Sequence, residues 1–277
     1  MKEVIIETLV DGIKLLPFLL VTFLLIEWLE HKVNSKKIIN KSGKLGPLFG
    51  GLLGAFPQCG FSVSATNLYT TRIVTMGTLV AVYLSTSDEM LPIMLSEGID
   101  FSTILKILLT KVVIGVLIGF IIDLIFRKKQ KIEIKDLCEE EHCHCEKGIF
   151  KSALHHTLSV FGFIIIISFI LNILLTYLGE DTLQNLFLKD SIFSPFISSL
   201  VGLIPNCASS VAITELYLNS AITFGSAMAG LLTGSGVGLL VLFKYNKNLK
   251  ENILILGIIY GVGVISGILI DLIGIVI

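Results

Sequence analysis

Two short motifs place a proline, a carboxamide and a cysteine inside apolar sequence: Pro57-Gln58-Cys59 and Pro205-Asn206-Cys207. The 13-residue segments that begin at the two prolines share seven identical positions, at an offset of 148 residues. Thiolates select soft metal ions and suit arsenicals, whereas carboxamide and hydroxyl oxygens suit manganese and other harder cations. Because polar groups are costly in apolar surroundings unless they have a role, we predict that Gln58, Cys59, Asn206 and Cys207 contact a substrate. A buried cysteine is also commonly only a small apolar residue, so either thiol could be inert.

Hydroxyl residues interrupt two apolar segments that are otherwise long enough to cross a membrane. One segment, residues 73–95, is broken at residues 85–89, and the other, residues 221–243, is broken at residues 233–236. We expect these hydroxyls to face the two cysteine motifs across a shared substrate site. The residues concerned are Ser85, Thr86, Ser87, Thr233 and Ser235. The alternative is that these small polar residues only let helices pack closely and form hydrogen bonds.

Four ionisable residues are candidates for binding a coupling ion. Asp88 and Glu89 interrupt an apolar run, which is typical of residues that bind a proton or a cation inside a membrane. Lys111 lies roughly 15 Å into its helix at the usual rise per residue and could neutralise one of them. Glu215 replaces Asn67 in the second copy of the motif and is expected to be a buried acid. The alternatives are that Asp88 and Glu89 lie at the outer membrane interface and that Glu215 forms a local salt bridge.

The central loop, residues 127–151, is the only sizeable hydrophilic segment and is rich in thiols and imidazoles. Its candidate metal ligands are Cys138, His142, Cys143, His144 and Cys145. Their spacing matches no structural zinc site, but side chains this close together could chelate a soft or borderline metal. The alternative is a solvated acidic linker. The cysteine spacing does not indicate a disulfide framework.

Composition identifies the elements that must position these residues. The chain has 277 residues, of which 53% are hydrophobic, with a mean hydropathy of +0.88. Several apolar runs are long enough to cross a hydrocarbon core of roughly 30 Å, which predicts an all-α polytopic membrane protein. The first run, residues 9–29, lacks a small-residue cleavage site and is expected to be a retained helix. Residues 48–56 and 60–69 are too short to cross, so they predict a re-entrant hairpin with its tip at Pro57.

The offset of 148 extends far beyond the cysteine motifs, which indicates an internal duplication. Matched pairs include Pro47 with Pro195 and Asp123 with Asp271. We therefore divide the chain into transmembrane repeat 1 (residues 1–126), the linker (127–151) and transmembrane repeat 2 (152–277). Asp123 lies one turn before Arg127, so an ion pair at the helix end is its expected role.

The distribution of charge predicts the orientation of the two repeats. Segments 30–46, 127–151 and 244–250 hold 15 of the 21 lysines and arginines, which marks them as cytoplasmic. Segments 96–100 and 179–194 are acidic and are expected outside. Equivalent loops then lie on opposite sides, which predicts an inverted repeat with two re-entrant hairpins and broken transmembrane helices. Both termini are expected outside the inner (plasma) membrane, with the central loop in the cytoplasm.

The two Pro-Gln/Asn-Cys motifs, the break at residues 85–89 and the Cys/His-rich loop resemble a family of bacterial membrane proteins. Its members are described as heavy-metal exporters of about ten transmembrane segments and are labelled arsenic efflux proteins or manganese transporters. The resemblance covers essentially the whole chain. It implies that the substrate is a metal or a metalloid.

We therefore predict a secondary active transporter that exports a heavy metal or metalloid from the cytoplasm by alternating access. Coupling protons are expected at Asp88 or Glu89, and no nucleotide-binding motif indicates an ATP-driven pump. The expected partners are the lipid bilayer, the metal or metalloid substrate and protons, with no nucleic acid and no cofactor besides the transported ion and a possible metal on the central loop. The alternatives are a transporter of a small organic anion, using Lys111 as the anion site, and a membrane thiol enzyme. The enzyme is disfavoured because neither intramembrane cysteine has a Cys-x-x-Cys or Cys/His partner in sequence.

Overall fold

A computed structural model describes residues 45–56, 60–87, 90–126, 149–178 and 193–274, together with isolated positions between residues 10 and 24. Every regular element in these ranges is an α-helix. Within these described ranges, three stretches are long and apolar enough to cross a bilayer: Phe101–Phe126, Phe224–Tyr245 and Leu249–Ile273. The prediction of an all-α polytopic membrane protein is confirmed.

The helices of the second half repeat those of the first. In the first half they are α3 (Gly46–Gly54), α4 (Gly60–Thr70), α5 (Met76–Ser85), α6 (Met90–Ser96) and α7 (Phe101–Phe126). In the second half they are α11 (Ser194–Gly202), α12 (Cys207–Leu218), α13 (Phe224–Thr233), α14 (Gly238–Tyr245) and α15 (Leu249–Ile273). The bounds of α3 and α11, and those of α5 and α13, differ by 148 residues at both ends. The long helix α9 (Ile149–Leu178) precedes the second set.

The short helices end where the sequence predicts. α3 and α11 have nine residues each, or roughly 14 Å at the usual rise, which is about half of a hydrocarbon core. α5 stops at Ser85, because the hydroxyls of Ser85 and Thr86 donate to Ala81 O and Val82 O at 2.8 and 2.7 Å and compete with the helical ladder. α13 stops at Thr233 and is followed by Gly234 and by Gly236, whose φ is +56°. The predicted breaks near residues 85–89 and 233–236 are therefore present.

In each half, an aspartate caps the amino end of the helix that precedes the break, α5 in the first half and α13 in the second. Asp123 accepts hydrogen bonds from Thr75 Oγ1 at 2.8 Å and from the Gly77 amide at 3.0 Å. Asp271 accepts the equivalent bonds from Thr223 Oγ1 at 2.8 Å and from the Gly225 amide at 2.9 Å. A carboxylate is favourable there because the amino end of a helix carries partial positive charge. Asp123 therefore caps α5, and the expected ion pair with Arg127 stays a prediction because Arg127 lies outside the described residues.

Glycines bring the central helix of each half into backbone contact with the long helix that follows. A Cβ on Gly77 would lie 2.1 Å from Gly119 O, and one on Gly225 would lie 2.3 Å from Gly267 O. Any side chain at these two positions would push α5 from α7, or α13 from α15. On its other face α7 exposes a stripe of apolar side chains suited to lipid. These are Leu109, Val113, Leu117, Ile121 and Leu124.

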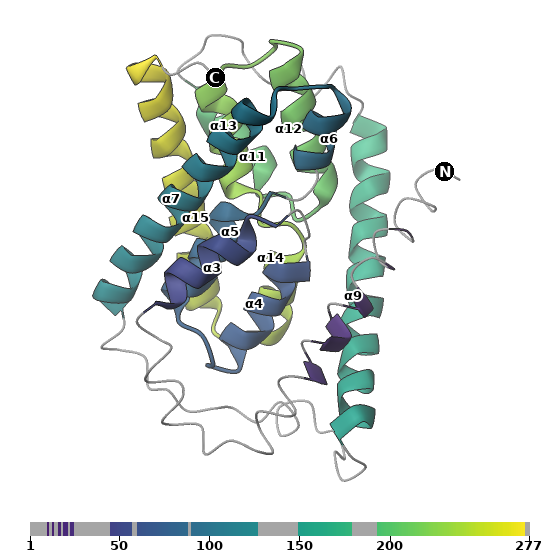
Figure 1. Ribbon diagram of the computed structural model, residues 1–277. Coiled ribbons are helices and arrows are strands. Elements are labelled where there is room, and N and C mark those ends of the chain that lie inside the picture. The colour runs from purple at the N-terminus through teal and green to yellow at the C-terminus, as the bar shows by residue number, and fades with distance from the viewer. Residues whose placement is uncertain are drawn as a thin grey trace.

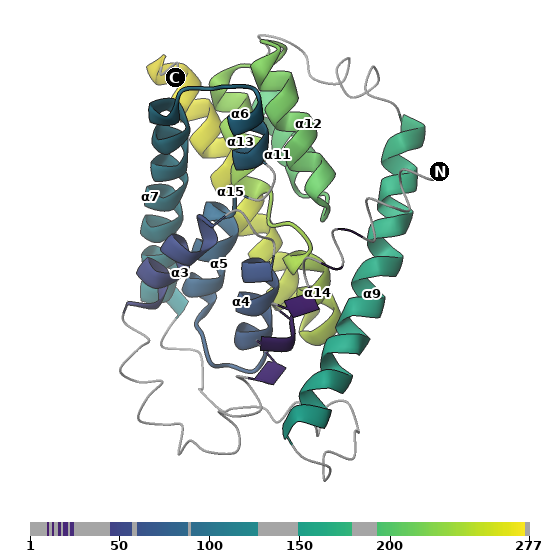
Figure 2. The same ribbon diagram turned by 45° about the vertical axis from the view of Figure 1, so that its right-hand side comes forward.

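Equivalent helices of the two halves run in opposite directions. The residue colours in Figures 1 and 2 show that α7 and α15 run in opposite directions along the molecule. One short helix of each half packs against a helix of the other half: α4 of the first half packs against α14, and α12 of the second half packs against α6. α4 and α14 lie at the lower end of the molecule in both views, and α6 and α12 lie at the upper end. A second apolar cluster, which includes Phe23, Val160 and Val241, joins α9 to α14.

Candidate functional site

A polar pocket lies where the broken helices of the two halves meet. The empty space within it and at its opening to solvent is about 260 Å³. The lining comes from both helix breaks, from α7 and from the first turn of α12. The lining residues are Thr86, Ser87, Met90, Lys111, Asn206, Ser209, Ser210, Leu231, Gly234 and Gly236.

Lys111 supplies the charge of the described lining. Its side chain is 1% exposed. The ammonium donates to Thr86 O, at the carboxyl end of α5, and to Leu231 O of α13 at 2.8 Å. Helix carboxyl ends carry partial negative charge, so a cation is favourable there. One ammonium thus joins the broken helices of both halves, and the equivalent position in the second half is the buried Ile259.

The amino end of α12 faces the same pocket. Asn206 is its N-cap residue, but its side chain makes no capping hydrogen bond. Ser209 Oγ donates to Asn206 O, and Ser210 Oγ donates to Cys207 O, each at 2.8 Å. Because these protons are directed to the backbone, the hydroxyl oxygens are left as acceptors toward the pocket. The pocket therefore combines hydroxyl and carboxamide oxygens, one ammonium and the thioether of Met90.

The model of the ArsP_2 family, described as "Putative, 10TM heavy-metal exporter", matches residues 1–181 and 158–275. The chain belongs to this family. No curated protein and no solved structure matches it. The family description confirms the resemblance seen in the sequence and supports a metal transporter in general.

In this ArsP_2 member, four of the predicted site residues line the pocket: Thr86, Ser87, Lys111 and Asn206. Cys207 is buried at 7% exposure but does not belong to the lining. Gln58, Cys59, Asp88 and Glu89 lie outside the described residues, as do the loop residues Cys138, His142, Cys143, His144 and Cys145. In the part of the chain that is described, no three His, Cys, Asp or Glu residues are grouped to hold a metal.

Three predicted hydroxyl residues do not belong to the lining. Thr233 Oγ1 donates a hydrogen bond to Ser199 O at 2.9 Å, which joins α13 to α11. Ser85 bonds to its own helix, and a Cβ on Gly54 would lie 2.2 Å from its Oγ. Ser235 is buried, and none of the residues that the structure describes forms a hydrogen bond with its hydroxyl. Helix packing, the alternative interpretation, describes Ser85 and Thr233.

The expectation that Glu215 is a buried acid is wrong. Its side chain is exposed on α12, whereas the equivalent Asn67 on α4 is 2% exposed. α4 and α12 pack against equivalent helices, α14 and α6, yet Asn67 is buried and Glu215 is exposed, so equivalent positions do not share burial. Glu215 is therefore far more weakly supported as a coupling group than Lys111.

The sequence interpretation missed several lining residues. Ser209 and Ser210 lie in the second cysteine motif, two and three residues after Cys207. Since α12 begins at Cys207, the first helical turn carries them beside Asn206, and the spacing alone could have indicated them. Met90 and Leu231 gave no such signal, because apolar residues in an apolar run look like core.

Proposed function

We propose that this protein is a secondary active transporter that exports a heavy metal or metalloid from the cytoplasm by alternating access. The observation that carries the proposal is the polar pocket between two broken helices, one from each half of a duplicated chain. Inverted-repeat transporters bind their substrates at such breaks, near the middle of the membrane. The antiparallel arrangement of α7 and α15 supports this architecture.

The lining favours particular cargo chemistry. Hydroxyl and carboxamide oxygens suit either a hydroxylated metalloid, such as an arsenical, or a harder cation such as manganese. The Lys111 ammonium adds positive charge, which favours a neutral or anionic metalloid species over a bare divalent cation. Cys59 and Cys207 remain proposed thiol ligands, although Cys207 would have to turn toward the pocket.

Coupling protons are proposed to exchange at Asp88 or Glu89. In the sequence they follow Ser87, a lining residue, and this position next to the pocket lining supports the proposal. Lys111 completes this group as a fixed cation between the two halves. The cysteines and histidines of the central loop are proposed to capture the metal on the cytoplasmic side.

The orientation is supported by the helix ends that flank the basic segments. The last residue of α7, the first residue of α9 and the connection between α14 and α15 all lie at the lower end of the molecule (Figures 1 and 2). Basic segments 127–151 and 244–250 join these ends. We therefore take the lower end as cytoplasmic.

Flux into proteoliposomes tests the function directly. Arsenite, manganese, zinc and a panel of organic acids are compared with and without a pH gradient. We expect flux of a metal or metalloid that the pH gradient stimulates. The Ser209→Ala, Ser210→Ala variant removes two pocket oxygens and should reduce this flux by about tenfold, a loss of about 1.4 kcal/mol. Ser102→Ala, at an exposed position of α7, is the control.

Three outcomes would change the proposal. Flux of organic acids without metal flux would establish the alternative, for which the ammonium and the amino end of α12 are a suitable anion site. Equal flux in a Cys59→Ala, Cys207→Ala variant would remove the thiol ligands while leaving the pocket in place. Flux of metal that ignores the pH gradient would remove the proton coupling.

A further inference from the structure

The site has two sides built from equivalent residues, but only one of them holds the pocket. On the pocket side, Met90, Ser210 and Leu231 belong to the lining. Their equivalents at the offset of 148 are Gly238, Ser62 and Tyr83. These three pack closely: a Cβ on Gly238 would lie 2.9 Å from Tyr83 Cε1 and 3.0 Å from Ser62 Cβ. We call this packed region between α4 and α14 the closed side.

Hydrogen bonds hold the closed side together. Thr66 Oγ1 donates to Ser62 O at 2.7 Å within α4, lies 2.5 Å from Tyr83 OH, and makes a longer contact of 3.3 Å with Gly238 O across the two halves. On the pocket side the equivalent threonine, Thr214, repeats the bond within its own helix and donates to Ser210 O at 2.7 Å. The equivalent of Tyr83 there is Leu231, which has no hydroxyl and cannot make the other bond.

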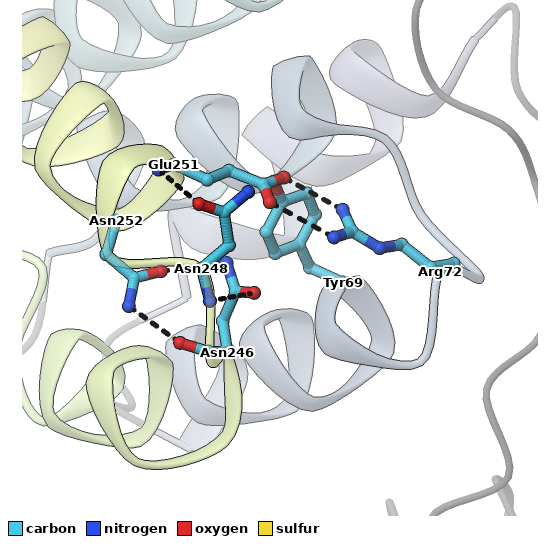
Figure 3. Close-up of polar contacts among 6 residues, drawn as sticks. All are labelled: Tyr69, Arg72, Asn246, Asn248, Glu251 and Asn252. Atoms are coloured by element: carbon cyan, nitrogen blue, oxygen red, sulfur yellow. Dashed lines mark hydrogen bonds and ion pairs between the residues drawn. The ribbon is translucent and has the colours of Figure 1, made fainter.

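A cluster at the lower end of the molecule, which we call the latch, also joins the two halves. It consists of Tyr69, Arg72 and Glu251 (Figure 3). Arg72, just after α4, forms a bidentate ion pair with Glu251, in the first turn of α15, at 2.8 and 3.0 Å. Tyr69 OH donates to the same carboxylate. The paired side chains are 20% and 13% exposed, and such charge-assisted, bidentate bonds are among the stronger ones in proteins.

Asparagines fix the position of Glu251. Asn246 Nδ2 donates to Asn252 Oδ1 at 2.8 Å, and Asn252 Nδ2 donates to Asn246 O at 2.9 Å. Asn248 Oδ1 accepts from the Glu251 amide at 3.4 Å and caps α15. Figure 3 shows these side chains between α14 and the start of α15, beside the latch. The carboxylate is therefore held ready for Arg72.

The latch has no counterpart in the other half. The residues equivalent to Tyr69, Arg72 and Glu251 are Tyr217, Ser220 and Thr103. Arg72 and Ser220 share a left-handed backbone, with φ of 63° and 56°. The turn is thus repeated while the charges are not, and Asn246 and Asn252 likewise correspond to Gly98 and Ile104.

Resting on the proposed alternating access, we infer that the latch and the closed side form the cytoplasmic gate of this transporter. In the opposite state, the two halves exchange conformations: α12 packs as closely against α6 as α4 now does against α14, and α4 separates from α14. That exchange breaks the Arg72–Glu251 pair and forms no equivalent pair. The latch therefore favours the state in which the cytoplasmic side is closed, and it must open in every transport cycle.

Hydrogen–deuterium exchange of the full chain in lipid nanodiscs tests the gate without any cargo. Arg72→Ala and Glu251→Ala should raise exchange in α4 and α14 by about tenfold, equivalent to about 1.4 kcal/mol, and lower it in α6 and α12. The charge swap Arg72→Glu, Glu251→Arg should restore the wild-type pattern. Adding a pair to the other half, with Ser220→Arg and Thr103→Glu, should protect α6 and α12 instead. Ser220→Ala and Thr103→Ala are the matched controls.

The reciprocal change decides the outcome. Exchange that rises only around Arg72, with α6 and α12 unaffected, would reduce the latch to a local ion pair and overturn the proposal. Unchanged exchange in both alanine variants would overturn it too, as would a swapped pair that folds but remains open. Failure of the transport function appears separately, as an absence of metal flux in wild-type proteoliposomes, and leaves the reciprocal exchange readable.

Discussion

At the scale of single residues, Lys111 is the group on which both halves depend. A buried ammonium is costly in a membrane unless it is paired with charge or carbonyl oxygens. Here the carboxyl ends of α5 and α13 supply those oxygens through Thr86 O and Leu231 O. The second half places Ile259 at the equivalent position, so a hydrophobic side chain would fill the space. Lys111 is therefore expected to serve transport.

Replacing Lys111 by methionine should abolish most transport and destabilise the protein. The variant leaves two carbonyls without their donor, and hydrogen bonds to charged groups contribute about 2 kcal/mol each. Flux and thermal unfolding in detergent are the measurements. Ile259→Met is the matched control, because a volume-conserving core change costs less than about 1.5 kcal/mol. Wild-type flux in Lys111→Met would show that the ammonium is only structural.

At the scale of elements, the sequence predicts where helices stop better than it predicts what they contact. The breaks after Ser85 and Thr233 follow from local chemistry, since hydroxyls and glycines act on their own helix. The role of Asp123 could not be read in this way. Two of its partners, Thr75 and Gly77, lie 48 and 46 residues away, beyond the reach of a local pattern, while the ion pair with Arg127 stays a prediction.

Glu215 shows a second limit at the element scale. Its environment was inferred from the offset of 148, as if equivalent helices were equally well packed. α4 and α12 do pack against equivalent helices, α14 and α6, but the first contact is close whereas a pocket lies on the side of the second. A duplication in the sequence predicts the positions of the helices, but it does not predict which of two equivalent helix pairs is closely packed.

The aspartate caps give a prediction about α5 and α13. Asp123→Ala should cost about 2 kcal/mol, because it leaves a buried donor unsatisfied, whereas Asp271→Ala should cost about 1 kcal/mol or less, as for exposed helix-end charges. The difference follows from burial: Asp123 is 6% exposed and Asp271 is exposed. Thermal unfolding in detergent provides the comparison. Glu97→Ala, at an exposed position, is the control, and a larger effect at Asp271 would contradict the packing described.

At the scale of the whole molecule, the two sides of the site are built from equivalent helices but differ in their contacts, and this difference can favour transport in one direction. The repeated helix bounds provide two arrangements of one scaffold. The one-sided latch and the single ammonium make those arrangements differ in free energy. This free-energy difference favours export only if the latch faces the cytoplasm. The orientation of the chain in the membrane must therefore be measured.

A thiol reagent should reach the central loop only from the cytoplasm, and the loop's own cysteines are the sites of labelling. A membrane-impermeant maleimide should not modify Cys138, Cys143 or Cys145 in intact cells. It should modify them after the cells are permeabilised. A variant with all three replaced by serine should lose that signal. Glu97→Cys, in the turn between α6 and α7, lies at the opposite end and should react in intact cells. Labelling of the loop in intact cells would invert the orientation, and the latch would then close the outer side of the site.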